Sequence, residues 1–199
     1  LWRPRPARQG GVERARNHLL PDNVNGSRAV TSILFLCTGN SARSILAEAL
    51  ANHMGGGRLQ AHSAGSFPKG APHPMALQLL AERGITGDFR SKSWEEFAAP
   101  GAPPIDIVIT VCDNAAGELC PIFPGRAIKA HWGIADPAAV EGEGQRAAFE
   151  IAYDQMQARI AALLELDLAD DPQVLQRRLA AIGRFEGATD GAGHAAADC

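Results

Sequence analysis

The sequence lacks the features that would place it in a membrane or on a nucleic acid. No apolar run approaches the roughly 18 residues that a transmembrane helix needs, and the most apolar stretch, IDIVITV at 105–111, has only the length of a strand. A formal charge of −3 gives no electrostatic attraction to nucleic acid or to an anionic membrane. The first residues also show no apolar segment of a secretory signal. We therefore expect no nucleic-acid partner and no membrane partner.

Cysteine is scarce as well. Four cysteines in 199 residues do not make the framework of a disulfide-dense secreted domain, so we expect reduced thiols and a cytoplasmic location. A hydrophobic content of 46% is ample for one α/β domain, which we expect as a monomer. The domain is predicted at residues 31–185. Residues 1–30, which are rich in Arg, Pro and Gly, and the small polar tail at 186–199 are predicted to be disordered.

Apolar runs alternate with amphipathic helical patterns inside this domain. The expected strands are 31–37, 58–65, 105–111 and 127–132, and the expected helices are 41–53, 73–84, 93–98, 142–166 and 171–184. This alternation predicts an α/β fold, a three-layer sandwich in which a four-stranded parallel sheet carries helices on both faces. Active sites of such sheets lie outside the carboxyl ends of the strands. Cys37, Cys112 and the loop after His131 are all expected at that edge.

The stretch CTGNSARS at 37–44 joins the first expected strand to a helix. Its amides can point inward as an anion cradle, to which the helix N-terminus adds partial positive charge. Arg43 can clamp two oxygens of a tetrahedral oxyanion above Cys37. The amides, Arg43 and the Ser44 hydroxyl are expected to lower the pKa of the Cys37 thiol. The alternative is an inert buried cysteine followed by a solvent-facing arginine. The predicted oxyanion-binding loop comprises Thr38, Gly39, Asn40, Ser41, Ala42 and Arg43.

A displacement at an oxyanion also needs a general acid for the leaving oxygen. Asp136 precedes Pro137 in HWGIADPA, on the loop that follows the fourth expected strand. Asp-Pro alone is an ordinary turn or helix start. Considered together with the Cys37 loop, Asp136 is better interpreted as the acid.

These segments together resemble a known family. CTGNSARS, SAG at 63–65, SKS at 91–93, VITVCDNAAGELCP and HWGIADPA are similar to the arsenate reductases built on the low-molecular-weight protein tyrosine phosphatase fold, known as phosphotyrosine phosphatase I-like. The resemblance covers about residues 31–185. It implies that Cys37 is the nucleophile, Arg43 the oxyanion clamp, Ser44 the thiolate stabiliser and Asp136 the general acid.

The resemblance also implies a thiol relay. Reduction of As(V) to As(III) takes two electrons, which two thiols supply by ending as a disulfide. Cys112 would attack the Cys37–arsenic adduct, and Cys120 would then take over the bond as Cys112–Cys120. Thioredoxin, or glutaredoxin with glutathione, would return the electrons, with no bound cofactor. An inert Cys112 and an incidental Cys120 are the alternatives for these thiols; the C-x7-C spacing is poor for zinc, and Cys199 is treated as incidental.

Some relatives bind potassium beside the loop, at positions that match Asn40, Glu48 and Ser63. Lys92 stands near the place where a further acidic ligand is expected, and we predict no metal here. A loop-bracing amide, a solvated helix residue and a turn hydroxyl are equally good interpretations of those three side chains.

Two other functions share the Cys37 loop. A low-molecular-weight phosphotyrosine phosphatase would hydrolyse phosphate monoesters through a phospho-enzyme on Cys37, and a reductase of this type can keep residual activity of that kind. Such phosphatases usually have aromatic residues after the Asp-Pro pair, where this chain has Ala138, Ala139 and Val140, and its single tyrosine lies elsewhere. A non-catalytic anion or redox sensor is the third possibility, and it predicts disulfide formation without turnover.

Overall fold

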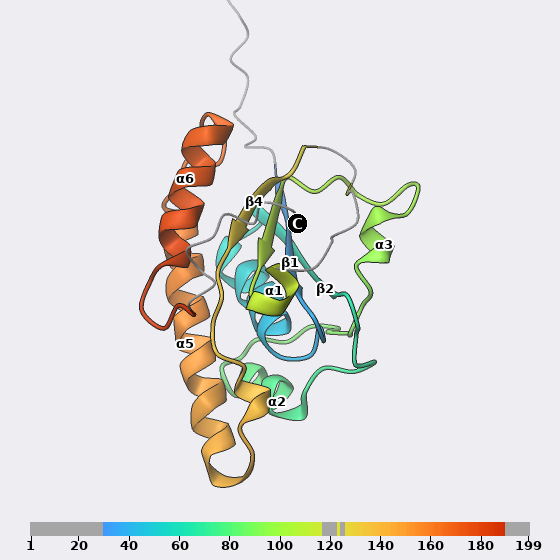
Figure 1. Cartoon of the computed structure of the whole chain (residues 1–199), viewed down its shortest axis with the longest axis vertical. Coiled ribbons are helices and arrows are strands. Elements are labelled where there is room, and N and C mark those ends of the chain that lie inside the picture. The colour runs from blue at the N-terminus through green and yellow to red at the C-terminus, as the bar shows by residue number, and fades with distance from the viewer. Residues whose placement is uncertain (1–29, 117–122, 124–125, 190–199) are drawn as a thin grey trace, which may run out of the picture.

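A parallel sheet forms the centre of the molecule in the computed structural model, which describes residues 30–116, 123 and 126–189. Its four strands are all parallel, as the sequence predicted, and they lie in the order β2-β1-β3-β4 (Figure 1). The pairing register places Cys37 opposite Gly65 and Thr110 opposite His131, so the expected site segments meet at one edge. The strands are β1 (Thr31–Cys37), β2 (Leu59–Gly65), β3 (Ile107–Thr110) and β4 (Ile128–His131).

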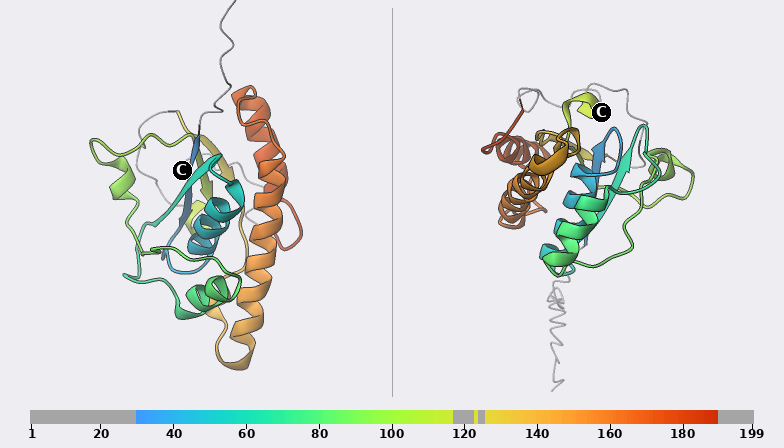
Figure 2. Two further views of the ribbon diagram at one scale, coloured as in Figure 1. Left: turned by 180° about the vertical axis from the view of Figure 1, so that it is seen from behind. Right: turned by 90° about the horizontal axis from the view of Figure 1, so that it is seen from below.

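Helices cover both faces of the sheet, unequally. Figure 2 shows α5 and α6 on one side of the sheet and the short α3 on the other. Alternate side chains of β1 accordingly enter two cores: Ile33 and Phe35 face the larger one, and Leu34 and Leu36 the smaller. Burial on both faces explains the unbroken apolar run of β1. The helices are α1 (Arg43–Gly55), α2 (Pro74–Glu82), α3 (Glu95–Ala98), α4 (Asp113–Ala116), α5 (Gln145–Leu164) and α6 (Pro172–Gly183), with 3-10 turns η1 (Pro137–Ala139) and η2 (Gly142–Gly144).

The starts of α2 and α6 are capped by side chains. His73 accepts a hydrogen bond from the backbone of Met75 at 3.1 Å, and Asp171 accepts from those of Gln173 and Val174 at 2.9 and 3.2 Å. Both helices have proline in their first turn, where its missing N–H costs nothing. One stripe of α5 faces the core, and each of its members is at most 3% exposed: Phe149, Ala152, Met156, Ile160 and Leu163.

Two short elements next to the site were not predicted. The four-residue α4 follows Cys112, and η1 begins after Asp136. Residues 1–29, 117–122, 124–125 and 190–199 lie outside the described residues, so the predictions for the N-terminal extension, for the tail from residue 190, for Cys120 and for Cys199 remain predictions. Residues 186–189 of the predicted tail are described, and Ala188 forms a β-bridge with Ile134. None of the helices within the described ranges is both long enough and apolar enough to cross a membrane.

Candidate active site

Cys37 ends β1, and only 4% of it is exposed. Its Sγ lies 2.9 Å from Oγ of Ser44, in the first turn of α1, and accepts the backbone N–H of Asn40 at 3.2 Å. Two donors that belong to the loop and to the helix start therefore converge on one sulfur. A thiolate at this position would be hydrogen-bonded from both.

The loop between Cys37 and Arg43 is held from the outside. Its carbonyl groups at Thr38, Gly39 and Ser41 accept backbone hydrogen bonds of 2.8–3.0 Å from residues 67, 69 and 73. Because these carbonyls face outward, intervening amides can turn inward, and the Asn40 N–H does so toward Cys37. Asn40 has a φ of +39°, a left-handed conformation that asparagine tolerates better than most residues.

Gly65, at the end of β2, allows the backbone of the loop to pack closely against this strand. A Cβ atom added at this position would lie 2.4 Å from the carbonyl oxygen of Thr38 and 2.9 Å from the backbone nitrogen of Asn40. No side chain fits between β2 and the loop at such distances. The SAG stretch that contributed to the family resemblance thus has a steric reason for its glycine.

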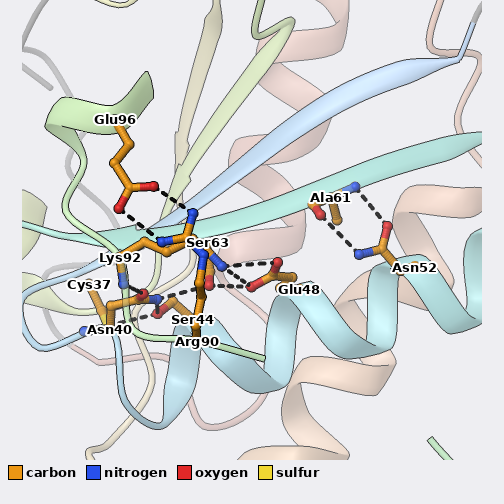
Figure 3. A network of polar contacts seen from close by, with 10 residues as sticks. All are labelled: Cys37, Asn40, Ser44, Glu48, Asn52, Ala61, Ser63, Arg90, Lys92 and Glu96. Carbon is orange, nitrogen blue, oxygen red and sulfur yellow. Dashed lines mark hydrogen bonds and ion pairs between the residues drawn. The ribbon is translucent and has the colours of Figure 1, made fainter. Parts of the chain in front are cut away.

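The side chain of Asn40 ties this loop to its neighbours (Figure 3). Its Nδ2 donates to Oγ of Ser44 at 2.9 Å and to Oγ of Ser63 at 2.8 Å, while its Oδ1 accepts the backbone N–H of Lys92 at 2.6 Å. Ser44 receives a hydrogen from Asn40, so its own hydroxyl hydrogen can be directed to Cys37. Asn40 braces the loop, one of the roles considered from the sequence.

Arg43 and Asp136, predicted as clamp and acid, are brought together. Nη2 of Arg43 lies 3.0 Å from Oδ2 of Asp136, and Nη1 donates to the carbonyl of Ile134 at 3.1 Å. Asp136 caps η1 through a 3.1 Å hydrogen bond from Ala138 and remains 41% exposed, while the Arg43 side chain is 15% exposed. The arginine thereby holds the acid-bearing loop beside the start of α1.

The pKa of Cys37 moves against the prediction. Burial raises the pKa of its thiol above the ordinary value, and the nearby Cys112 adds to the rise, while the Ser44 hydroxyl and Arg43 lower it. Desolvation of a thiolate is the largest of these effects, and burial is a tertiary property that the loop sequence does not reveal. The predicted lowering of this pKa is therefore wrong, because burial outweighs the donors of the loop.

Cys112 lies two residues after the end of β3 and beside the same loop. Its Sγ is 3.7 Å from Oγ1 of Thr38 and accepts the backbone N–H of Ala115 at 3.4 Å. The residue is 2% exposed, and both it and Cys37 are free thiols. The parallel pairing of β1 with β3 thus places a second thiol at the loop.

Comparison with known proteins agrees with this geometry. Residues 32–177 match the family described as low molecular weight phosphotyrosine protein phosphatase. The chain belongs to this family. An arsenate reductase of Shouchella clausii is 35% identical over 135 residues, which make up 67% of this chain and 94% of that protein.

Solved structures of the family are similar as well. The thioredoxin-dependent arsenate reductase of Corynebacterium glutamicum gives a TM-score of 0.51 at 28% identity, over 69% of this chain and 61% of that one. The low molecular weight protein tyrosine phosphatase of T. tengcongensis gives a TM-score of 0.50 at 27% identity. The match covers 63% of this chain and 95% of that one. The predicted phosphatase I-like fold is confirmed.

The potassium positions of the family do not fit that ion here. Asn40, Glu48 and Ser63 do converge, and Ser63 donates a hydrogen bond to Glu48. Nζ of Lys92, however, lies 3.2 and 3.0 Å from the two carboxylate oxygens of Glu48. An ammonium group already neutralises the acidic ligand, so a second cation would meet repulsion there. In the described ranges, no group of three or more His, Cys, Asp or Glu side chains could hold a metal ion.

His131 is buried and contacts the turn that follows Cys112. Its Nε2 lies 3.0 Å from Oδ1 of Asp113 in that turn. Its Nδ1 lies 2.7 Å from Oγ1 of Thr110, and Thr189 also donates to Asp113 at 2.6 Å. These contacts hold the Cys112 turn in place. No sequence pattern indicates these contacts, because the partners lie 18 to 76 residues apart.

Proposed function

We propose that this chain reduces arsenate to arsenite, with Cys37 as the nucleophile, and serves arsenic detoxification in the cytoplasm. The observation that supports this most is the second buried thiol, Cys112, with its Sγ 3.7 Å from Oγ1 of Thr38 in the oxyanion loop. A phosphatase needs one thiol at this site, whereas a two-electron reduction by thiols needs two. The relatives named as arsenate reductases support the same choice of substrate.

In the first step, the loop amides and Arg43 bind arsenate above Cys37. Sγ attacks arsenic, an arsenic–oxygen bond breaks, and the departing oxygen leaves as water. The proton that Cys37 loses when its thiolate forms passes to the bound oxyanion and supplies one hydrogen of that water. Asp136 forms an ion pair with Arg43, the residue that binds the oxyanion, and therefore lies close to the leaving oxygen. We assign Asp136 as the group that delivers a proton to this oxygen.

In the second step, Cys112 attacks Sγ of Cys37. The sulfur–arsenic electron pair goes to arsenic, which leaves as arsenite in the As(III) state, and a Cys37–Cys112 disulfide forms. The two thiols lose the two electrons that arsenic gains. Cys120, which lies outside the described residues, would then exchange to give Cys112–Cys120.

An external dithiol must reduce that last disulfide. We propose thioredoxin, or glutaredoxin with glutathione, as the donor; the Corynebacterium glutamicum relative is described as thioredoxin-dependent. The enzyme is proposed to act as a monomer without a bound cofactor. Residues 31–185 would form the working domain.

Hydrolysis of phosphate monoesters is the second candidate, because Cys37, Arg43 and Asp136 would serve it equally and the family includes phosphatases. After Asp136, the η1 turn contains Pro137, Ala138 and Ala139, and no aromatic wall for a phenol ring. This turn and Cys112 favour the reductase, with phosphatase activity as a residual property.

Arsenate-dependent NADPH oxidation, coupled through thioredoxin and its reductase, tests the proposal. Turnover by the wild type and its loss in Cys112→Ser are expected, with Cys199→Ser as the matched thiol control that keeps its rate. Absence of turnover with thioredoxin and also with glutaredoxin and glutathione would overturn the reductase. Intact aryl-phosphate hydrolysis in Cys112→Ser would then favour the phosphatase, and disulfide formation without either turnover would favour a sensor.

A further inference from the structure

An ion pair lies under the active-site loop, away from solvent. The side chains of Lys92 and Glu48 are 7% and 12% exposed, whereas those of the nearby pair Arg90–Glu96 are 57% and 43% exposed. Removing two charges from water is costly, and a buried pair is often no more stabilising than apolar residues would be. A role beyond stability is therefore the better explanation for Lys92 and Glu48.

A continuous chain of hydrogen bonds connects this pair to the nucleophile (Figure 3). The ammonium of Lys92 contacts the carboxylate of Glu48, which accepts the hydroxyl of Ser63. Asn40 donates to both Ser63 and Ser44. Ser44 lies 2.9 Å from Sγ of Cys37. The chain thus spans α1, β2 and the segment before α3.

Lys92 sets the direction of these hydrogen bonds at two points. Its backbone N–H donates to Oδ1 of Asn40, which forces Nδ2 of that amide toward the two serines. Its ammonium donates to both oxygens of the Glu48 side chain, which in turn accepts the hydroxyl hydrogen of Ser63. With both points fixed, the remaining free hydrogen of the chain, on Ser44, is directed to Cys37.

We propose that Lys92 is a positioning residue for the nucleophile, whose ammonium replaces the monovalent cation of other family members and orients the Ser44 hydroxyl toward Cys37. Lys92 acts on the sulfur through Glu48, Ser63 and Asn40. The statement rests on the proposed function only in calling Cys37 the nucleophile. Its effect on the sulfur is a property of the protein without arsenate.

The alkylation of Cys37 by iodoacetamide measures that effect directly, because only the thiolate reacts. Trypsin releases Cys37 in the peptide 29–43, which contains no other cysteine, so mass spectrometry follows this thiol alone. Lys92→Met removes the charge and keeps the length of the side chain. We expect its alkylation rate near neutral pH to fall about tenfold, with the midpoint of the pH profile displaced upward.

Two variants serve as controls. Arg90→Met removes a cation from the exposed pair two residues away and is expected to react like the wild type. Lys92→Arg keeps the charge and is expected to restore most of the rate. Thermal unfolding of each variant establishes that the folded protein is being measured.

Potassium tests the replacement of the cation. In Lys92→Ala, which leaves space beside Glu48, potassium chloride is expected to raise the alkylation rate of Cys37 above that in choline chloride at equal ionic strength. The wild type is expected to show no such difference. If potassium changes the alkylation rate of neither protein, the proposal that the Lys92 ammonium replaces a monovalent cation is overturned.

Lys92→Met that reacts like the wild type, or that is slowed by the same factor at every pH, would overturn the positioning role. Failure of arsenate turnover in the wild type leaves these alkylation results unaffected, so the failure of the proposed function is distinguishable. Normal turnover combined with unaltered alkylation in Lys92→Met would reject the positioning role and leave the reductase intact.

Discussion

Arg43 and Asp136 form an ion pair, with Nη2 3.0 Å from Oδ2, across the mouth of the oxyanion loop. The pair joins the start of α1 to the loop after β4, so clamp and acid are held together although they lie far apart in the sequence. An incoming oxyanion must share the guanidinium with Asp136. Substrate binding therefore alters the charge beside the acid at the moment when a proton is needed.

Arg43→Lys is expected to lower kcat/KM for arsenate by about 10²–10³-fold, in the range found when one charge-stabilising donor is lost. Lysine keeps the charge but lacks the planar fork that contacts Asp136 and Ile134 together. Steady-state kinetics of the coupled assay measures the loss, and Arg177→Lys, on the polar face of α6, is the control. A loss of less than about threefold would mean that Arg43 acts only as a diffuse charge.

Asp136→Asn is expected to slow the reaction by about 10²–10⁴-fold, because an amide cannot supply the proton to the leaving oxygen. The cap on η1 survives in part, since the asparagine oxygen still accepts from Ala138. Single-turnover reduction of arsenate at several pH values checks this, with the exposed Glu141→Gln as control. An unchanged rate, with an unchanged pH profile, would remove Asp136 from the chemistry.

Gly65→Ala is expected to destabilise the fold by about 1–3 kcal/mol, in the range of overpacked sites. The added Cβ would lie 2.4 Å from the Thr38 carbonyl, which forces β2 and the loop apart. Gly144→Ala is the control, because its φ of −76° suits alanine and its Cβ would meet only Val140, at 3.3 Å. Urea unfolding measures both variants, and equal midpoints would contradict the close approach of β2 to the loop.

The buried imidazole of His62 is expected to make the folded protein less stable in mild acid. Burial lowers the pKa of this imidazole, whose ring lies 5.3 Å from that of Phe97; Glu48 opposes the shift and Lys92 adds to it. The unfolded chain binds the proton more readily than the folded one, so the free energy of unfolding falls as the pH drops below about 6.5. His62→Gln should reduce the difference between unfolding at pH 7.5 and at about pH 5, and the exposed His53→Gln should not. An equal pH dependence in both variants would contradict the assignment.

The local sequence pattern was sufficient to predict the nucleophile Cys37 and the oxyanion clamp Arg43. Cys37, the loop and Arg43 are adjacent in sequence and are flanked by a strand and a helix, so their geometry follows from the chain itself. Cys112 and Asp136 required one further rule, that parallel strands bring their carboxyl ends to one edge. The capped starts of α2 and α6 were equally local, at His73 and Asp171.

The missed features all depend on tertiary packing. Thr189 and Asp113 lie 76 residues apart, so no periodicity or spacing connects them. Lys92 and Glu48 lie 44 residues apart, and only the family resemblance indicated that they are neighbours. The direction of the Cys37 pKa was wrong for the same reason, because burial outweighs the local donors. The Asn40–Ser44 contact is local, yet its orientation depends on the distant Lys92 backbone.

A single turnover with arsenate tests the central claim most directly. In Cys120→Ser the relay should stop at its first disulfide, so reduced protein given arsenate is expected to release arsenite and to show the peptide 29–43 linked to the peptide 93–126, which then contains Cys112 alone. Phosphate in place of arsenate should produce no link. Arsenate left unreduced, with both peptides recovered as free thiols, would contradict the proposal that Cys37 and Cys112 together reduce the oxyanion.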